Sequence, residues 1–71
     1  MNALMLVKLT NGRSHNPTIL VTVPRSDALH QEHAADDTAR AYLRREYPQG
    51  DYHTDSIGFV CQTEDDFIHY V

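Results

Sequence analysis

Apolar side chains recur at every second position in two segments near the start of the chain. In residues 3–9 every odd position is apolar, and in residues 18–23 Ile19, Val21 and Val23 alternate largely with threonine. A period of two is typical of strands that bury one face. Two turn sequences, Asn11-Gly12 and Asn16-Pro17, lie between them. We therefore expect a hairpin with a long connecting loop.

A 3.6-residue period follows these strands. Pro24 cannot donate to a strand ladder, and Ser26 or Asp27 can cap a helix that we expect to run to about Glu46. The apolar side of this helix should lie across the sheet. That side is formed by Ala28, Ala35, Ala39, Tyr42 and Leu43, with Leu29 and Tyr47 at its margin.

The last third of the chain predicts two more strands. Residues 47–50 end the helix, a polar stretch leads to a strand at about 57–62, and a short closing strand follows at 67–71. The order is β-β-α-β-β, in which two hairpins flank one helix. It predicts an α+β fold of one domain, residues 1–71, with a four-stranded, mainly antiparallel sheet and the helix packed on one face.

The expected core combines the inward side chains of the strands and the helix. Cys61 is the only cysteine and lies in an apolar run, so we assign it to the core and not to a disulfide. Leu4, Leu6 and Leu20 fall on the opposite sheet face, where they indicate a homodimer or a partner surface. The predicted core residues are Met5, Val7, Leu9, Ile19, Val21, Val23, Ala35, Ala39, Tyr42, Leu43, Phe59, Cys61 and Phe67.

The sequence has no motif for catalysis, a nucleotide or a cofactor. No nucleophile elbow is present, and Gly12, Gly50 and Gly58 are isolated, so no phosphate-cradling loop is expected. We therefore expect a protein that is not an enzyme and has no cofactor. No apolar run is long enough to cross a membrane and no basic segment precedes Ala3, so we expect it to remain in the cytoplasm.

Five histidines in 71 residues raise the question of a metal site. Zinc sites need three or four converging ligands, and the chain has neither C-x-x-C nor H-E-x-x-H. We expect no metal and predict exposed histidines, with His33 able to pair with Asp37 four residues later. Asp36 and Arg40 have the same helical spacing and can also pair.

Charge is distributed unevenly along the chain. All six basic residues lie in the first 45 positions with four acids, which gives +2, whereas the last 26 positions hold six acids and no Lys or Arg, which gives −6. We expect the carboxylates of residues 51–55 and 64–66, interleaved with tyrosines, to face a basic partner. The residues expected to bind the partner are Asp51, Tyr52, Asp55, Glu64, Asp65, Asp66 and Tyr70.

In length, β-β-α-β-β order and acidic, cysteine-poor composition the chain resembles the small anti-CRISPR proteins of phages and mobile elements. The resemblance implies a DNA-mimicking inhibitor that binds a CRISPR effector complex of the host cell and does not itself bind nucleic acid. Two alternatives remain open. One is an antitoxin or regulatory partner protein. The other is a small nucleic-acid-binding module that uses Arg13, Arg25, Arg40, Arg44 and Arg45.

Overall fold

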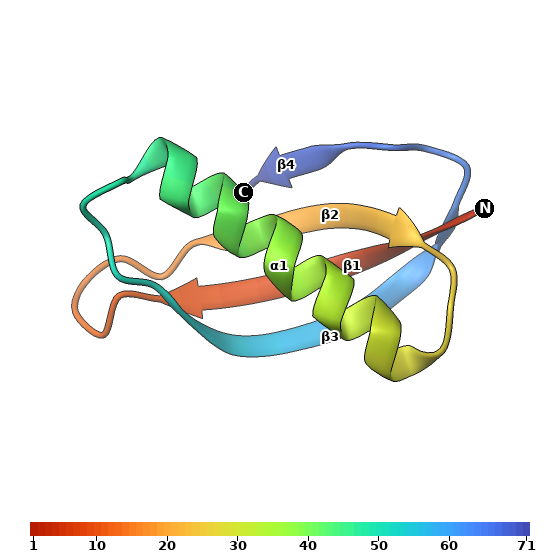
Figure 1. The fold of residues 1–71 in the computed structure, drawn as a ribbon, viewed down its shortest axis with the longest axis horizontal. Coiled ribbons are helices and arrows are strands. Elements are labelled where there is room, and N and C mark those ends of the chain that lie inside the picture. The colour runs from red at the N-terminus through yellow and green to blue at the C-terminus, as the bar shows by residue number, and fades with distance from the viewer.

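The computed structural model describes residues 1–71 and has one helix and four strands. The strands form a single antiparallel sheet in the order β3-β1-β2-β4, and the helix packs against it (Figure 1). The predicted α+β fold is thereby confirmed. The elements are β1 (Asn2–Thr10), β2 (Thr18–Pro24), α1 (Ala28–Glu46), β3 (His53–Thr63) and β4 (Ile68–Tyr70).

The central hairpin of β1 and β2 follows from the alternating pattern of the sequence. Its register places Met5 opposite Val21 and Val7 opposite Ile19, so one face of both strands is wholly apolar. The loop between them turns at Gly12, where φ is +75°, a conformation that favours glycine. The Asn11 side chain accepts hydrogen bonds from the amides of Arg13 and His15 and fixes the loop.

The second predicted hairpin is not formed. Although β3 and β4 are consecutive in the chain, β3 pairs with β1 and β4 pairs with β2, so they lie on opposite edges of the sheet. The four-residue connection crosses the end of the central hairpin. It is held there because Asn2 donates to the Asp65 carbonyl oxygen and the Thr22 amide donates to the Phe67 carbonyl oxygen.

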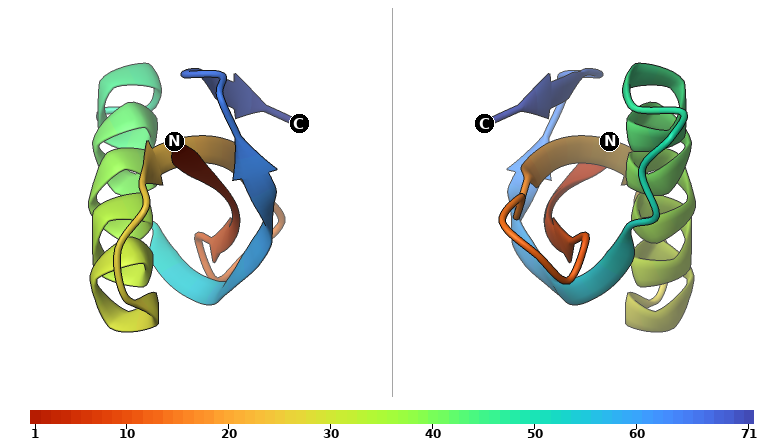
Figure 2. Two further views of the ribbon diagram at one scale, coloured as in Figure 1. Left: turned by 90° about the vertical axis from the view of Figure 1, so that its right-hand side faces the viewer. Right: turned by 90° about the vertical axis from the view of Figure 1, so that its left-hand side faces the viewer.

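Helix α1 begins where its capping residue predicts. Asp27 has an extended conformation, and its carboxylate accepts a hydrogen bond from the His30 amide, so it is the N-cap. Arg44 and Arg45 lie in the last turn, where positive charge complements the helix dipole. The helix covers one face of the curved sheet, and no helix covers the other (Figure 2). It does not have the long apolar stretch that a membrane-spanning helix requires.

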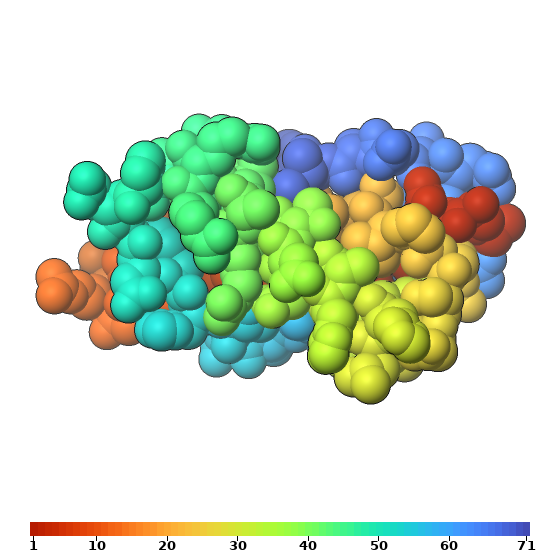
Figure 3. All heavy atoms as spheres, viewed as in Figure 1, coloured from red at the N-terminus to blue at the C-terminus, as the bar shows by residue number.

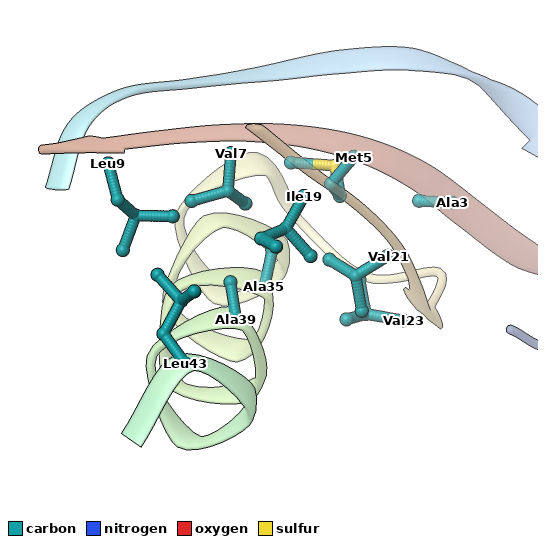
Figure 4. Close-up of a cluster of buried hydrophobic side chains, with 10 residues drawn as sticks. All are labelled: Ala3, Met5, Val7, Leu9, Ile19, Val21, Val23, Ala35, Ala39 and Leu43. Atoms are coloured by element: carbon teal, nitrogen blue, oxygen red, sulfur yellow. The ribbon is translucent and has the colours of Figure 1, made fainter. Parts of the chain in front are cut away.

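The core lies between α1 and the central hairpin, and ten side chains form it (Figure 4). All ten fall on the odd positions of β1 and β2 or on one side of α1, as a period of two and a period of 3.6 require. The members are Ala3, Met5, Val7, Leu9, Ile19, Val21, Val23, Ala35, Ala39 and Leu43.

Three predicted core residues of the last third are exposed. Phe59 is 50% exposed, Phe67 is 39% exposed, and Cys61 is a free, exposed thiol. The reason is that α1 covers β1 and β2 and leaves much of edge strand β3 uncovered. In addition, the register between β1 and β3 shifts between Leu4 and Met5, which changes the direction of the side chains that follow Phe59.

The apolar side of α1 is shorter than predicted. Ala28 and Leu29 are exposed and Tyr42 is half-buried. At the start of the helix the buried residue is Gln31 instead of Ala28 or Leu29. Its side chain accepts a hydrogen bond from the Ser26 amide. The polar Gln31 side chain can be buried because its Oε1 accepts a hydrogen bond from a backbone amide just before the helix.

Strand β3 is longer than predicted, and three leucines lie on the sheet face away from α1. Strand β3 starts at His53, four residues before the predicted position, because the polar stretch from 53 to 56 pairs with the end of β1. Leu4, Leu6 and Leu20 lie on the face away from α1 and are half-buried, with Leu6 directly opposite Leu20. The apolar patch on that face is therefore smaller than fully exposed leucines would make it.

Candidate functional site

The predicted acidic surface is divided between distant parts of the molecule. Asp51 lies in the loop before β3, Asp55 lies within β3, and the acidic turn (Glu64, Asp65 and Asp66) follows β3. Since β3 has eleven residues, it separates the two loops by roughly 33 Å. That length matches the long axis of the molecule, 34 Å. The two predicted acidic loops therefore lie at opposite ends and form no continuous surface (Figure 1).

The acidic turn has a defined backbone. The Asp65 amide donates to Thr63 Oγ1 at 3.0 Å, and the Asp65 carbonyl oxygen accepts from Asn2 Nδ2 at 2.7 Å. The Thr22 hydroxyl lies 3.2 Å from both Asp66 Oδ1 and the Phe67 carbonyl oxygen, and it accepts from the Phe67 amide at 2.9 Å. A single nearly buried threonine thus ties the turn to the sheet.

The carboxylates of the acidic turn have no basic partner. The chain makes three ion pairs, and these join Asp27 to His30, Asp36 to Arg40 and, at 3.9 Å, Asp51 to His53. Glu64, Asp65 and Asp66 are all exposed. The three carboxylates therefore face solvent without an ion pair inside the molecule.

The five arginines of the nucleic-acid alternative do not share one surface. The Arg25 guanidinium lies over the Phe59 ring at 5.2 Å, and Arg45 lies over the Tyr42 ring at 5.7 Å. Arg13 belongs to the loop 11–17, which projects from the end opposite the N-terminus (Figure 3). Arg40 and Arg44 lie on α1 near that same end. Arg25 follows β2, at the end that carries the acidic turn.

His15 lies in an aromatic environment that the sequence pattern did not predict. It was expected to be exposed, but it is half-buried, and the rings of Tyr47, Tyr52 and Tyr70 lie around it, with Tyr42 next to Tyr70. Its Nδ1 is hydrogen-bonded to the Tyr52 hydroxyl, and its Nε2 lies 2.5 Å from the Tyr70 hydroxyl. Tyr47 meets the imidazole edge-on at 5.2 Å between ring centres. We call these residues (His15, Tyr42, Tyr47, Tyr52 and Tyr70) the tyrosine cluster.

Two of the predicted partner-binding residues, Tyr52 and Tyr70, belong to the tyrosine cluster. The hydroxyl groups of Tyr52 and Tyr70 both contact His15, so their polar tips point into the molecule. Desolvation, followed by the neighbouring Tyr47 hydroxyl, raises the pKa of Tyr70 to about 12. Tyr70 therefore stays protonated over the physiological range. No local pattern could have indicated the cluster, because its members come from positions as far apart as 15 and 70.

The other histidines are on the surface. His33 does not pair with Asp37 as predicted, and His30 pairs instead with the N-cap Asp27, with Nδ1 and Oδ2 2.5 Å apart. This hydrogen bond is the main cause that lowers the pKa of Asp27. The predicted pair of Asp36 and Arg40 is confirmed, with Oδ1 and Nε 3.5 Å apart. No group of three or more His, Cys, Asp or Glu side chains is arranged to hold a metal ion.

Comparison with known proteins found no relative. No protein-family model matches the chain, and no curated protein and no solved structure matches it either. What the structure establishes is an α+β fold with an unneutralised acidic turn at one end.

Proposed function

We propose that this protein is a non-enzymatic, protein-binding inhibitor whose acidic turn docks on a basic surface of a nucleic-acid-handling partner. The observation that carries the proposal is the run of three exposed carboxylates, Glu64, Asp65 and Asp66, none of which forms an ion pair within the chain. Proteins that bind nucleic acid present Lys and Arg where phosphates are held. Carboxylates on a fixed turn can occupy such positions.

Apolar side chains beside the acidic turn support the same proposal. Phe67 follows the turn directly and is 39% exposed, and Met1 is 68% exposed. Met1 lies near the turn because the next residue, Asn2, donates to the Asp65 carbonyl oxygen. Charged groups alone give specificity and fast association more than affinity. An exposed aromatic ring next to them supplies contact area that excludes water.

The partner class that we propose is a CRISPR effector complex. The resemblance in size, element order and acidity implies an inhibitor that covers a surface where target DNA is read. The proposal uses a smaller site than the sequence predicted. It retains Glu64, Asp65 and Asp66, while Asp51 and Asp55 lie too far away to contact the same small patch.

A charge-reversal pull-down tests the proposal. The variant carries Glu64→Lys and Asp65→Lys, because the side chains of these two residues make no hydrogen bond within the chain, whereas Asp66 accepts from Thr22. The matched control carries Asp37→Lys and Asp51→Lys, which makes the same charge change outside the turn. Each protein is immobilised, exposed to a bacterial lysate that contains a CRISPR effector complex, and washed at low and at raised salt.

The wild type and the control should retain effector subunits at low salt and lose them as salt rises, because the contact is between exposed charges. The reversal variant should fail to retain them. If effector subunits are retained equally by all three proteins, or by none, the proposed role of the acidic turn is wrong. Circular dichroism of each variant shows whether the fold is kept.

A further inference from the structure

A second surface, at the end of the molecule opposite the acidic turn, is hollow and carries basic groups. A cavity of about 190 Å³ opens between the C-terminal half of α1 and the residues that lead into β3. It presents two guanidinium groups and an imidazole that can donate hydrogen bonds, against a single carboxylate. The residues that line it are Arg40, Leu43, Arg44, Gly50, Asp51, Tyr52 and His53.

Arg40 is held in place by groups behind it. Its Nε donates to Thr54 Oγ1 at 3.3 Å and lies 3.5 Å from Asp36 Oδ1, and Thr54 in turn donates to Asp36. Both contacts of Arg40 involve its Nε. The two Nη groups have no hydrogen-bond partner in the chain. A guanidinium fixed in this way presents a planar fork that fits the oxygens of an oxyanion.

Arg44 and His53 also line the cavity. Arg44 is one helical turn after Arg40, so both lie on the same side of α1, and Arg44 forms no ion pair in the chain. His53 enters from β3 and has only a 3.9 Å contact with Asp51, whose side chain is 93% exposed and free to turn away.

From this geometry we infer that the hollow binds a phosphate group carried by a small molecule. Two guanidinium groups and an imidazole suit the several acceptor oxygens of a phosphate better than the two of a carboxylate. The volume sets the size of the ligand, since pockets for drug-sized molecules have about 300 to 1,000 Å³. The hollow therefore holds a phosphate with a small substituent. The inference is independent of the proposed inhibitor function, because it uses the opposite end of the molecule.

Titration with inorganic phosphate, followed by NMR of the ¹⁵N-labelled protein at constant ionic strength, tests the inference. The amide signals of residues 40–54 and the side-chain signals of Arg40 and Arg44 should shift and saturate, and sodium chloride at the same ionic strength should not produce these shifts. Arg44→Gln and Arg40→Gln should each weaken binding about tenfold or more, since each removes charge-assisted hydrogen bonds. Arg45→Gln is the matched control, because Arg45 lies over Tyr42 and outside the hollow.

A dinucleotide with a 5′-phosphate and the same dinucleotide without it separate a terminal phosphate from a nucleic-acid backbone. Preference for the phosphorylated form supports the inference. Equal binding of the two forms would instead indicate backbone binding and overturn it. It is also overturned if phosphate gives no saturable shifts, or if Arg45→Gln weakens binding as much as Arg44→Gln.

Discussion

At one end of the molecule three tyrosines surround His15 and a fourth packs beside them, whereas at the other end the acidic turn is tied to the sheet through Thr22 and Asn2. The first end joins the 11–17 loop, α1, the start of β3 and β4 through aromatic rings. The second is a single turn with exposed carboxylates. The Tyr52 and Tyr70 hydroxyls are engaged with His15, whereas the Glu64 and Asp65 side chains form no hydrogen bond or ion pair within the chain. The tyrosine cluster is therefore expected to contribute more to stability than the acidic turn.

The largest effect is expected where the tyrosine-cluster end meets the core. Leu43 is almost completely buried in the last turns of α1, so Leu43→Ala should lower the free energy of unfolding by about 2 to 5 kcal/mol. Leu29→Ala, on the same helix, is the control because Leu29 is 61% exposed, and it should change stability by less than about 0.5 kcal/mol. Urea denaturation measures both, and equal losses would contradict the observed core.

Removal of His15 should have the next largest effect. His15→Ala takes away both hydrogen bonds to the Tyr52 and Tyr70 hydroxyls and should cost about 1 to 3 kcal/mol. His69→Ala, at an exposed position of β4, should be close to neutral. If both variants unfold at the same urea concentration as the wild type, the tyrosine cluster does not stabilise this end.

The cluster also predicts how stability depends on alkaline pH. The pKa of Tyr70 is about 12 in the folded protein and 10.0 for the unperturbed group, so the neutral phenol is favoured by folding. This contribution is complete below pH 10 and is lost as pH rises through 12. Unfolding measured between pH 9 and 12 should show this loss, and Tyr70→Phe should remove that part of the pH dependence. An unchanged profile in Tyr70→Phe would assign it to other groups.

An effect of similar size to that of His15→Ala is expected at the loop that carries Tyr52. A Cβ at Gly50 would lie 2.3 Å from the Tyr52 ring, which cannot move away freely because its hydroxyl is bonded to His15. Gly50→Ala should therefore cost about 1 to 3 kcal/mol. Gly58→Ala is the control, because a Cβ there meets nothing within 4 Å. Thermal unfolding of the pair distinguishes this close contact from a general effect of alanine.

The smallest effect is expected at the acidic turn. Thr22→Val keeps the shape of the side chain but removes the hydroxyl that serves Asp66 and Phe67, so it should cost about 1 kcal/mol. The Phe67 amide should exchange its hydrogen faster, since its acceptor is lost. Thr18→Val is the control, because the Thr18 hydroxyl makes no hydrogen bond. Unchanged exchange at Phe67 would show that other contacts hold the turn.

Local patterns predicted much of the fold and little of the site. The period of two on β1 and β2, the Asp27 cap and the 3.6-residue period of α1 depend on neighbours in the chain, so they could be read directly. The site depends on contacts across 37 to 63 positions, such as His15 with Tyr52 and Asn2 with Asp65. Residue spacing carries no information about such contacts.

By itself the sequence determined the element order, the apolar face of the central hairpin and the charge of each segment, because these follow from backbone periodicity and composition. Only the tertiary structure decided that β3 and β4 take opposite edges of the sheet. That choice left Phe59 and Cys61 in solvent and brought the tyrosines together. The physical reason is that one helix is too narrow to cover a four-stranded sheet completely, so the edge strands are placed largely by contacts with segments distant in the chain.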